Sequence, residues 1–191
     1  KENFSVHTVS TITTLRAALQ LAEDNREDRI QKFSAEVERK FVQLREKLAD
    51  IHEQAQDGII SDENANIDEA IAFIHNLKDG VDQIKSRGKQ LSQFQDLFGA
   101  PPDEIENLED VSQDIELKLK LWVSLKTFSQ LNQDWRECLF RDIDLDSMKH
   151  SVESHNFTAV QVEKGLPGNP LTGKLQEQVE EWKGILPAVS D

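Results

Sequence analysis

The sequence contains one cysteine, no tyrosine and no proline among its first hundred residues. A single thiol, Cys138, excludes a disulfide within the chain and is compatible with a reducing compartment. The absence of proline before Pro101 leaves long helices uninterrupted in the first half of the chain. No stretch approaches the ~18 apolar residues that a membrane span requires. These shortages favour long helices and disfavour a membrane-spanning protein.

Positive charge is also scarce. The chain carries 22 Lys and Arg against 36 Asp and Glu, which gives a net charge of −14. Such a polyanion gains nothing from counterion release on DNA or RNA, so nucleic-acid binding is disfavoured. Anionic membrane surfaces are disfavoured for the same reason, whereas basic protein surfaces remain allowed. Because the sequence starts without a methionine and without a signal-peptide pattern, we expect a segment of a longer protein.

Apolar residues recur at steps of three and four along much of the chain, which is typical of amphipathic helices. A first helix is expected over residues 10–56, ended by Gly58, and a second is expected to be capped by Ser61 or Asp62. Their apolar stripes comprise Ile12, Leu15, Leu19, Ala22, Ile30, Phe33, Val37, Phe41, Leu44, Leu48, Ile51 and Ala55, then Ile67, Ile71, Ile74, Leu77, Val81, Ile84, Leu91, Phe94 and Phe98.

The sequence Gly-Ala-Pro-Pro over residues 99–102 is expected to stop the second helix. Asp103 then opens a third helix, whose first turn is acidic, as the helix dipole favours. Long antiparallel helices with short turns predict an all-α fold, a spectrin-like bundle followed by shorter helices. We expect residues 1–100 to hold two long antiparallel helices, and residues 101–191 to hold the third bundle helix and the shorter helices.

The last third of the chain has a less regular pattern. Phe140 and Ile143 are expected to point inward from a segment without regular structure. The expected elements are an irregular segment over 136–145, a helix over 146–164, a turn over 165–170, and a final helix over 171–186 that Pro187 ends.

Residues 168–175 read GNPLTGKL and nearly spell a phosphate-binding loop. That loop cradles phosphate with backbone N–H groups and needs Ser or Thr after its lysine to hold magnesium. Here Leu175 follows Lys174, Pro170 removes one N–H group, and a helix rather than a strand is expected before the motif. We therefore interpret the motif as a turn between helices, and we expect no catalytic residue and no cofactor in this chain.

Acidic residues at positions 142, 144 and 146, with Glu153 at the twelfth position, are similar to a calcium-binding loop. The sixth position, where such loops need glycine for a sharp turn, is Ser147. The favoured interpretation is the start of a helix, capped by Asp144 or Asp146.

The spacing of His150 and His155 occurs in zinc fingers, but Cys138 is the sole thiol and no second cysteine ligand exists. We expect two surface histidines, a half-buried structural thiol and no metal site. Aromatic residues make up only 6% of the chain, so its three tryptophans are expected to be buried, each anchoring a contact between helices.

An ordered series of residues begins at Leu121-Trp122 and ends at Leu186-Pro187. Its structural members are Trp122, Phe128, Trp135, Phe140, Ile143, Leu166, Pro167, Asn169, Pro170, Trp182 and Pro187. Over residues 115–191 the chain resembles the start of the linker region of dynein heavy chains, more closely the axonemal (ciliary or flagellar) type than the cytoplasmic type. Departures are modest: Trp182 stands where phenylalanine is expected, and Cys138-Leu139 where a small residue and proline are common.

The resemblance implies a non-catalytic tail-to-linker segment of a microtubule motor ATPase, whose ATPase modules lie elsewhere in the heavy chain. In such motors the linker swings across the ATPase ring and passes force to the tail. Implied partners are other dynein heavy, intermediate or light chains and, through the tail, the doublet microtubule; neither nucleic acid nor membrane is expected. The implied location is cytoplasmic and cytoskeletal, in the cilium axoneme.

The alternative from another class is a spectrin-like cytoskeletal scaffold or cross-linker unrelated to a motor. It fits the helical stripes between residues 10 and 135 equally well. It fits the EKGLPGNP segment of residues 163–170 poorly.

Overall fold

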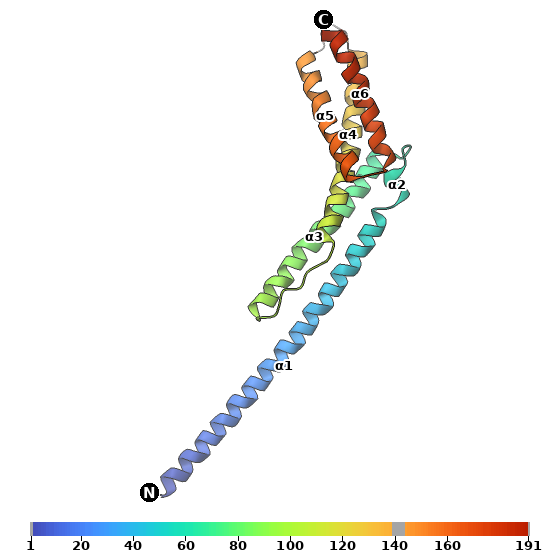
Figure 1. The fold of residues 1–191 in the computed structure, drawn as a ribbon. Coiled ribbons are helices and arrows are strands. Elements are labelled where there is room, and N and C mark those ends of the chain that lie inside the picture. The colour runs from blue at the N-terminus through green and yellow to red at the C-terminus, as the bar shows by residue number, and fades with distance from the viewer. Residues whose placement is uncertain (1, 139–143, 191) are drawn as a thin grey trace. The chain divides into compact units, whose positions relative to one another are not determined.

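The computed structural model describes the backbone of residues 2–138 and 144–190, and the side chains of residues 11–138 and 144–188. These described residues form α-helices and no strand, which confirms the predicted all-α class (Figure 1). Among the helices described, we find no candidate for a membrane-spanning segment. The chain divides into two compact units: unit 1 comprises residues 1–45 and 86–105, and unit 2 comprises residues 46–85 and 106–191.

The first helix, α1, extends from Glu2 to Gln54 and contains neither glycine nor proline. The predicted break after it is confirmed, because Asp57 ends the run and caps the short helix α2 (Gly58–Ser61). The Asp57 carboxylate accepts a hydrogen bond from the Ile59 N–H at 3.0 Å. Only four residues long, α2 forms part of the connection to the next helix.

Helix α3 extends from Ile67 to Leu97, and its predicted caps are wrong. Ser61 belongs to α2, and the Asp62 carboxylate accepts a bond from the Asn64 N–H inside the connection. The cap is Asn66, whose side-chain oxygen accepts hydrogen bonds from the first N–H groups of α3 at 2.9 and 3.3 Å. An Asn side chain satisfies these otherwise unpaired donors as well as Ser or Asp does.

Helix α4 extends from Leu108 to Glu137, so the prediction that it opens at Asp103 is wrong. Side chains of α1 and α3 instead hold the carboxylate and the main-chain groups of Asp103. The turn into α4 is made at Asn107, which adopts φ 61°, a left-handed conformation that asparagine tolerates better than most residues.

The last two helices are α5 (Leu145–Gly165) and α6 (Pro170–Ser190). Asp144 caps α5, as predicted, by accepting a bond from the Ser147 N–H at 3.1 Å. Pro187 does not end α6 as predicted. A proline removes one backbone hydrogen bond but has a helical φ, and α6 continues for three residues after it. Phe140 and Ile143 lie outside the described residues.

In unit 1, the apolar stripe of α1 is buried only in its second half. The Phe33 ring lies 4.5 Å from that of Phe98 and 6.1 Å from that of Phe94, and Val37 and Phe41 are buried. The predicted stripe begins earlier, at Ile12, Leu15 and Leu19, but these side chains are 45–63% exposed. The helix prediction for this part is confirmed, and its apolar residues do not belong to a core of the described chain.

Unit 2 contains a three-helix arrangement of α4, α5 and α6 (Figure 1). The Leu117 side chain abuts Gly165, and Phe128 contacts His155, so α5 runs antiparallel to α4. The buried residues of these helices and of the turn between α5 and α6 include Leu121, Trp122, Leu125, Phe128, Met148, Val152, Ala159, Val162, Leu166, Leu171, Leu175, Val179 and Trp182.

Charge is divided unevenly between the two units. Unit 1 contains ten acidic and ten basic residues, whereas unit 2 contains 26 acidic and 12 basic residues. The whole net charge of −14 therefore lies in unit 2.

Candidate functional site

Four aromatic rings from α4, α5 and α6 form a cluster, which we call the aromatic cluster. Phe128 and Trp135 of α4 lie edge to face at 5.9 Å, and Trp135 meets Trp182 of α6 edge to face at 4.9 Å. His155 of α5 lies against Phe128 at 4.9 Å. Edge-to-face pairs at these distances stabilise beyond the burial of area alone. The cluster therefore ties the three helices of unit 2 together.

Polar groups fix the orientation of the Trp182 ring. Its indole N–H donates to the Asn132 side-chain oxygen at 3.0 Å, and the Arg136 guanidinium lies 6.0 Å from its ring centre. Arg136 also forms an ion pair with Glu181 at 2.6 Å. Both charged side chains are about half exposed, so this pair contributes little to stability, whereas the partly buried indole bond fixes geometry.

The turn between α5 and α6, at residues 165–170, is built from local hydrogen bonds. Gly168 adopts φ 81°, which glycine allows without steric cost. The Asn169 side-chain oxygen accepts from the Leu171 N–H at 3.0 Å, and the Thr172 hydroxyl donates to the Asn169 carbonyl at 2.7 Å. Leu166 is buried, and this anchors the turn to the helices below it.

The turn lines a surface cavity of about 400 Å³ together with Gln56, Ser61, Asp114 and Lys118. Pro170 is the first residue of α6, where its missing N–H would have no intrahelical partner in any case. The first free N–H group of α6, that of Leu171, already donates to the Asn169 side chain. The motif follows the helix α5 rather than a strand. The structure thus agrees with the interpretation of GNPLTGKL as a turn rather than a phosphate-binding loop.

One face of α4 contacts the connection between α1 and α3. Lys118 is buried, and its ammonium donates to the Ala55 carbonyl at 2.8 Å and to the Asp114 carboxylate at 2.7 Å. One turn later the Trp122 indole donates to the Ile60 carbonyl at 3.0 Å. Burial of these polar groups is tolerated because each has a partner.

Ion pairs between α3 and α4 show that these helices run antiparallel in unit 2. Lys85 pairs with Glu109 at 3.0 Å, and Lys78 lies 3.8 Å from Glu116. The hydrogen bond to Asp82 raises the pKa of Lys78, partial burial opposes this, and the negative charges of Asp82 and Glu116 add to it. These contacts fix register at the surface more than they stabilise the fold.

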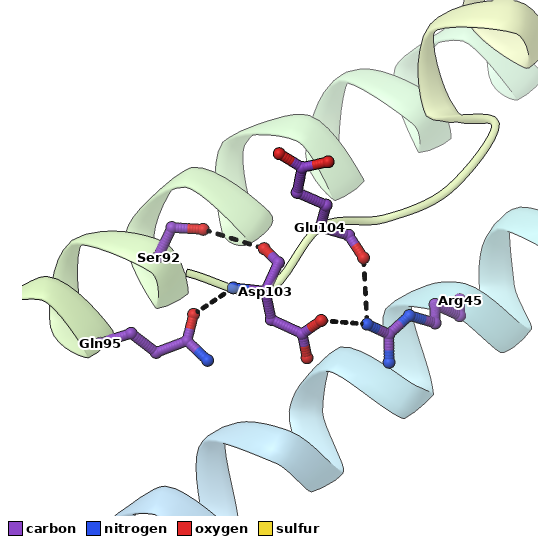
Figure 2. Close-up of polar contacts among 5 residues, drawn as sticks. All are labelled: Arg45, Ser92, Gln95, Asp103 and Glu104. Carbon is purple, nitrogen blue, oxygen red and sulfur yellow. Dashed lines mark hydrogen bonds and ion pairs between the residues drawn. The ribbon is translucent and has the colours of Figure 1, made fainter. Parts of the chain in front are cut away.

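The connection between α3 and α4 in unit 1 is held by polar contacts, which Figure 2 shows. The Arg45 guanidinium of α1 donates to the Asp103 carboxylate and, at 3.0 Å, to the Glu104 carbonyl. The Asp103 N–H donates to the Gln95 side-chain oxygen at 2.9 Å. The backbone of this extended segment is therefore satisfied by side chains rather than by helix formation.

Two predictions about reactive and metal-binding residues, those for Cys138 and His155, are wrong. Cys138 is exposed rather than half-buried, and His155 is half-buried against Phe128 rather than on the surface. Within residues 2–138 and 144–190, no group of His, Cys, Asp and Glu side chains is arranged to hold a metal ion. In the acidic segment, position 142 lies outside the described residues, and Asp144 serves as a helix cap.

The structure brings together three of the predicted linker residues, Phe128, Trp135 and Trp182, although Trp135 is only half-buried. The others are distributed over the unit: Trp122 contacts the α1–α3 connection, Leu166, Pro167, Asn169 and Pro170 form the turn, and Pro187 lies in α6 beside a groove between α5 and α6.

Sequence reasoning missed Lys118, Asn132 and Arg45. A lysine gives no sequence signal that its ammonium will be buried on a main-chain carbonyl, as that of Lys118 is. Asn132 lies one turn before Arg136 and faces α6, but its partner is 50 residues away. These contacts depend on tertiary structure rather than on local pattern.

The residues described in unit 2 thus pack helices together, cap them and link them by hydrogen bonds. These are the features of a helical structural segment. Residues 108–191 match the family model described as dynein heavy chain, N-terminal region 2, and the match begins at the first residue of α4. The human protein named dynein axonemal heavy chain 6 is 29% identical over 192 residues, which cover 100% of this chain and 5% of that protein.

Two further relatives show weaker similarity. The human dynein axonemal heavy chain 14 is 20% identical over 92% of this chain and 5% of its own length. The Chlamydomonas reinhardtii dynein-1-beta heavy chain of the flagellar inner arm I1 complex is 18% identical over 64% of this chain and 3% of its own length. Residues 108–191 thus match the N-terminal region of dynein heavy chains, and the whole chain is similar to a short part of axonemal heavy chains.

Proposed function

We propose that this segment transmits force between the ATPase ring of a microtubule motor and the tail that attaches the motor to its cargo or doublet microtubule. The observation that carries the proposal is the coincidence of the family match with α4–α6, the helices that the aromatic cluster ties together. A segment that passes force must resist bending. Interdigitated side chains in a close-packed core provide that resistance.

The location and partners that we propose follow from the relatives. The human relatives are named as axonemal heavy chains, and the algal one as part of a flagellar inner arm complex. We place this chain in the axoneme of a cilium or flagellum, in contact with other dynein subunits. Residues 1–100 would belong to the tail and residues 101–191 to the start of the linker, and the segment would bind no cofactor of its own.

Similarity over the whole chain counts against the scaffold alternative. The sequence resemblance covered residues 115–191, but the match to the human relative includes residues 1–114 as well. A spectrin-like scaffold unrelated to a motor does not account for that extent. This chain spans about 5% of the length of that relative. The motor activity of the longer heavy chain to which we assign this segment is therefore itself part of the proposal.

The test uses the full heavy chain, attached to a surface by its tail, with Trp182→Ala introduced in α6. Trp182 is 6% exposed and joins two helices, so its removal should loosen α4–α6. We expect microtubule-stimulated ATPase activity to be retained and microtubule gliding to slow. Gln176→Ala, at an exposed position of the same helix, is the matched control and should change neither.

Two results would contradict the proposal. Normal gliding by a Trp182→Ala heavy chain, with a measured loss of stability in α4–α6, would show that force does not pass through these helices. Equal loss of ATPase activity and gliding would place the segment in the catalytic cycle rather than in force transmission.

A further inference from the structure

The connection between α1 and α3, residues 55–66, is buried at two points although it contains only the short helix α2. Ala55 and Ile60 are each 1% exposed. Their carbonyl groups therefore need partners within the protein, because an unpaired buried carbonyl costs free energy comparable to a lost hydrogen bond. Both partners come from α4.

Three residues of α4 at intervals of four, Lys118, Trp122 and Lys126, reach this connection and its border; we call them the anchor residues. Residues four apart lie on the same face of a helix. Lys118 donates to the Ala55 carbonyl, Trp122 donates to the Ile60 carbonyl, and Lys126 pairs with the Asp68 carboxylate in the first turn of α3. The anchor residues thus follow the connection from the end of α1 to the start of α3.

The anchor residues differ in strength. The Lys118 side chain is 8% exposed and its charge is balanced by Asp114, and Trp122 is 1% exposed, so both hydrogen bonds are shielded from water. The pair of Lys126 and Asp68 is exposed on both sides and contributes little. The connection is held at two buried points, and Lys174 of α6 adds an exposed contact to the Glu63 carbonyl at 3.2 Å.

Both buried bonds end on main-chain carbonyls rather than on side chains. A side chain can change rotamer when it is pulled, but a carbonyl moves only with its backbone. The donors lie inside the family match of residues 108–191, and the acceptors lie before it.

We propose that Lys118 and Trp122 are positioning residues that make this face of α4 a mechanical joint, through which a displacement of α4 is passed to the α1–α3 connection. The inference rests on the proposed function and names the point within unit 2 at which load enters the segment before α4. Lys118 is not among the residues that carried the family resemblance, and Trp122 is among them only as a packing residue.

The test introduces Lys118→Met and Trp122→Phe separately into the full heavy chain. Methionine keeps much of the length of lysine without its ammonium, and phenylalanine keeps an aromatic ring without the indole N–H. Because each change removes a buried hydrogen bond, amide hydrogen exchange of residues 57–66 should become about tenfold faster. ATPase activity should be retained while microtubule gliding slows.

Matched controls separate the joint from general damage to α4. Lys120→Met removes the same charge from the same helix, but Lys120 contacts Gln161 of α5. Trp135→Phe makes the same ring change in the aromatic cluster. The partners described for Lys120 and Trp135 lie outside residues 55–66. Neither variant should therefore raise the rate of amide hydrogen exchange in that connection.

The outcomes distinguish the two proposals. Unchanged exchange in residues 57–66, or loss of ATPase activity in the anchor variants, would overturn the joint. Faster exchange with normal gliding would also overturn it, and if Trp182→Ala still slows gliding, the force-transmission proposal stands. If Trp182→Ala leaves gliding normal as well, the proposed function itself has failed.

Discussion

Replacing Trp182 by alanine tests the packing of α4–α6 most directly. The side chain is 6% exposed, meets Trp135 at 4.9 Å, and donates its indole N–H to Asn132 at 3.0 Å. Truncating a buried Trp to Ala typically costs about 3–5 kcal/mol, a range that includes the lost ring contact and the cavity. We expect about 4 kcal/mol for Trp182→Ala, because burial is nearly complete and one polar partner is also lost.

Related substitutions divide this cost. Trp182→Phe keeps a ring against Trp135 but loses the bond to Asn132, so roughly 1–2 kcal/mol is expected. Trp135→Ala should cost about 2–3 kcal/mol, less than Trp182→Ala, because Trp135 is only half-buried. The double variant should fall short of the sum of the two by about 1 kcal/mol, the scale of an edge-to-face pair.

Thermal unfolding of the 191-residue chain, followed by far-UV circular dichroism, measures these costs. For a chain of this size a loss of 1 kcal/mol lowers Tm by roughly 2–4 °C, so Trp182→Ala should lower the transition of unit 2 by roughly 8–16 °C. Gln176→Ala, exposed on the same helix, should leave Tm unchanged. A shift of only a degree or two for Trp182→Ala would refute the packing described for the aromatic cluster.

Four further predictions follow from individual contacts. A Cβ on Gly165 would clash with the Leu117 side chain, so Gly165→Ala should cost about 1–3 kcal/mol in urea unfolding. Gly173 has open space around it inside α6, so Gly173→Ala should stabilise the chain by up to about 1 kcal/mol. Asp144→Ala should cost about 1 kcal/mol through loss of the α5 cap, and Asp146→Ala, which removes only a first-turn charge, should cost less in the same assay. Arg45→Ala should accelerate amide exchange and proteolysis in residues 99–107, and Arg39→Ala on the same helix should not; equal rates in both variants would count against the contacts in Figure 2. A hydrogen bond to Asp82 raises the pKa of Lys78 in the folded chain. The stabilisation that the charged Lys78 provides is therefore complete below the usual Lys pKa and is lost as the pH rises through the raised pKa. The difference in stability between the native chain and Lys78→Met should shrink over that alkaline range.

Local sequence patterns predicted the helices well and their ends less well. The stripes from Ile30 onward identified α1 and α3, and glycine and asparagine in residues 165–170 identified the turn before α6. Helix starts were misjudged at two acidic residues, although a third, Asp144, caps α5 as expected. Asp62 and Asp103 are engaged by other groups, and Asn66 and Asn107 make the turns into α3 and α4.

The linker-like residues could be selected from the sequence, but their arrangement could not. Periodicity places Phe128 and Trp135 on one helix, and nothing local indicates that Trp182 completes the cluster. Lys118 was missed for a related reason. Its burial depends on the Ala55 carbonyl, which lies 63 residues away, and on the balancing charge of Asp114. Contacts of that separation are decided by how helices assemble, which a single sequence does not encode in any local pattern.

The uneven division of charge means that ionic strength should act on the two units differently. Unit 2 carries the whole net charge of −14, so like charges repel within it, and added salt screens that repulsion. Unit 1, with equal numbers of acidic and basic residues, has no net repulsion to relieve. Salt should therefore raise the unfolding temperature of unit 2 while changing that of unit 1 little. Whether the two units unfold together or separately should then depend on the ionic strength.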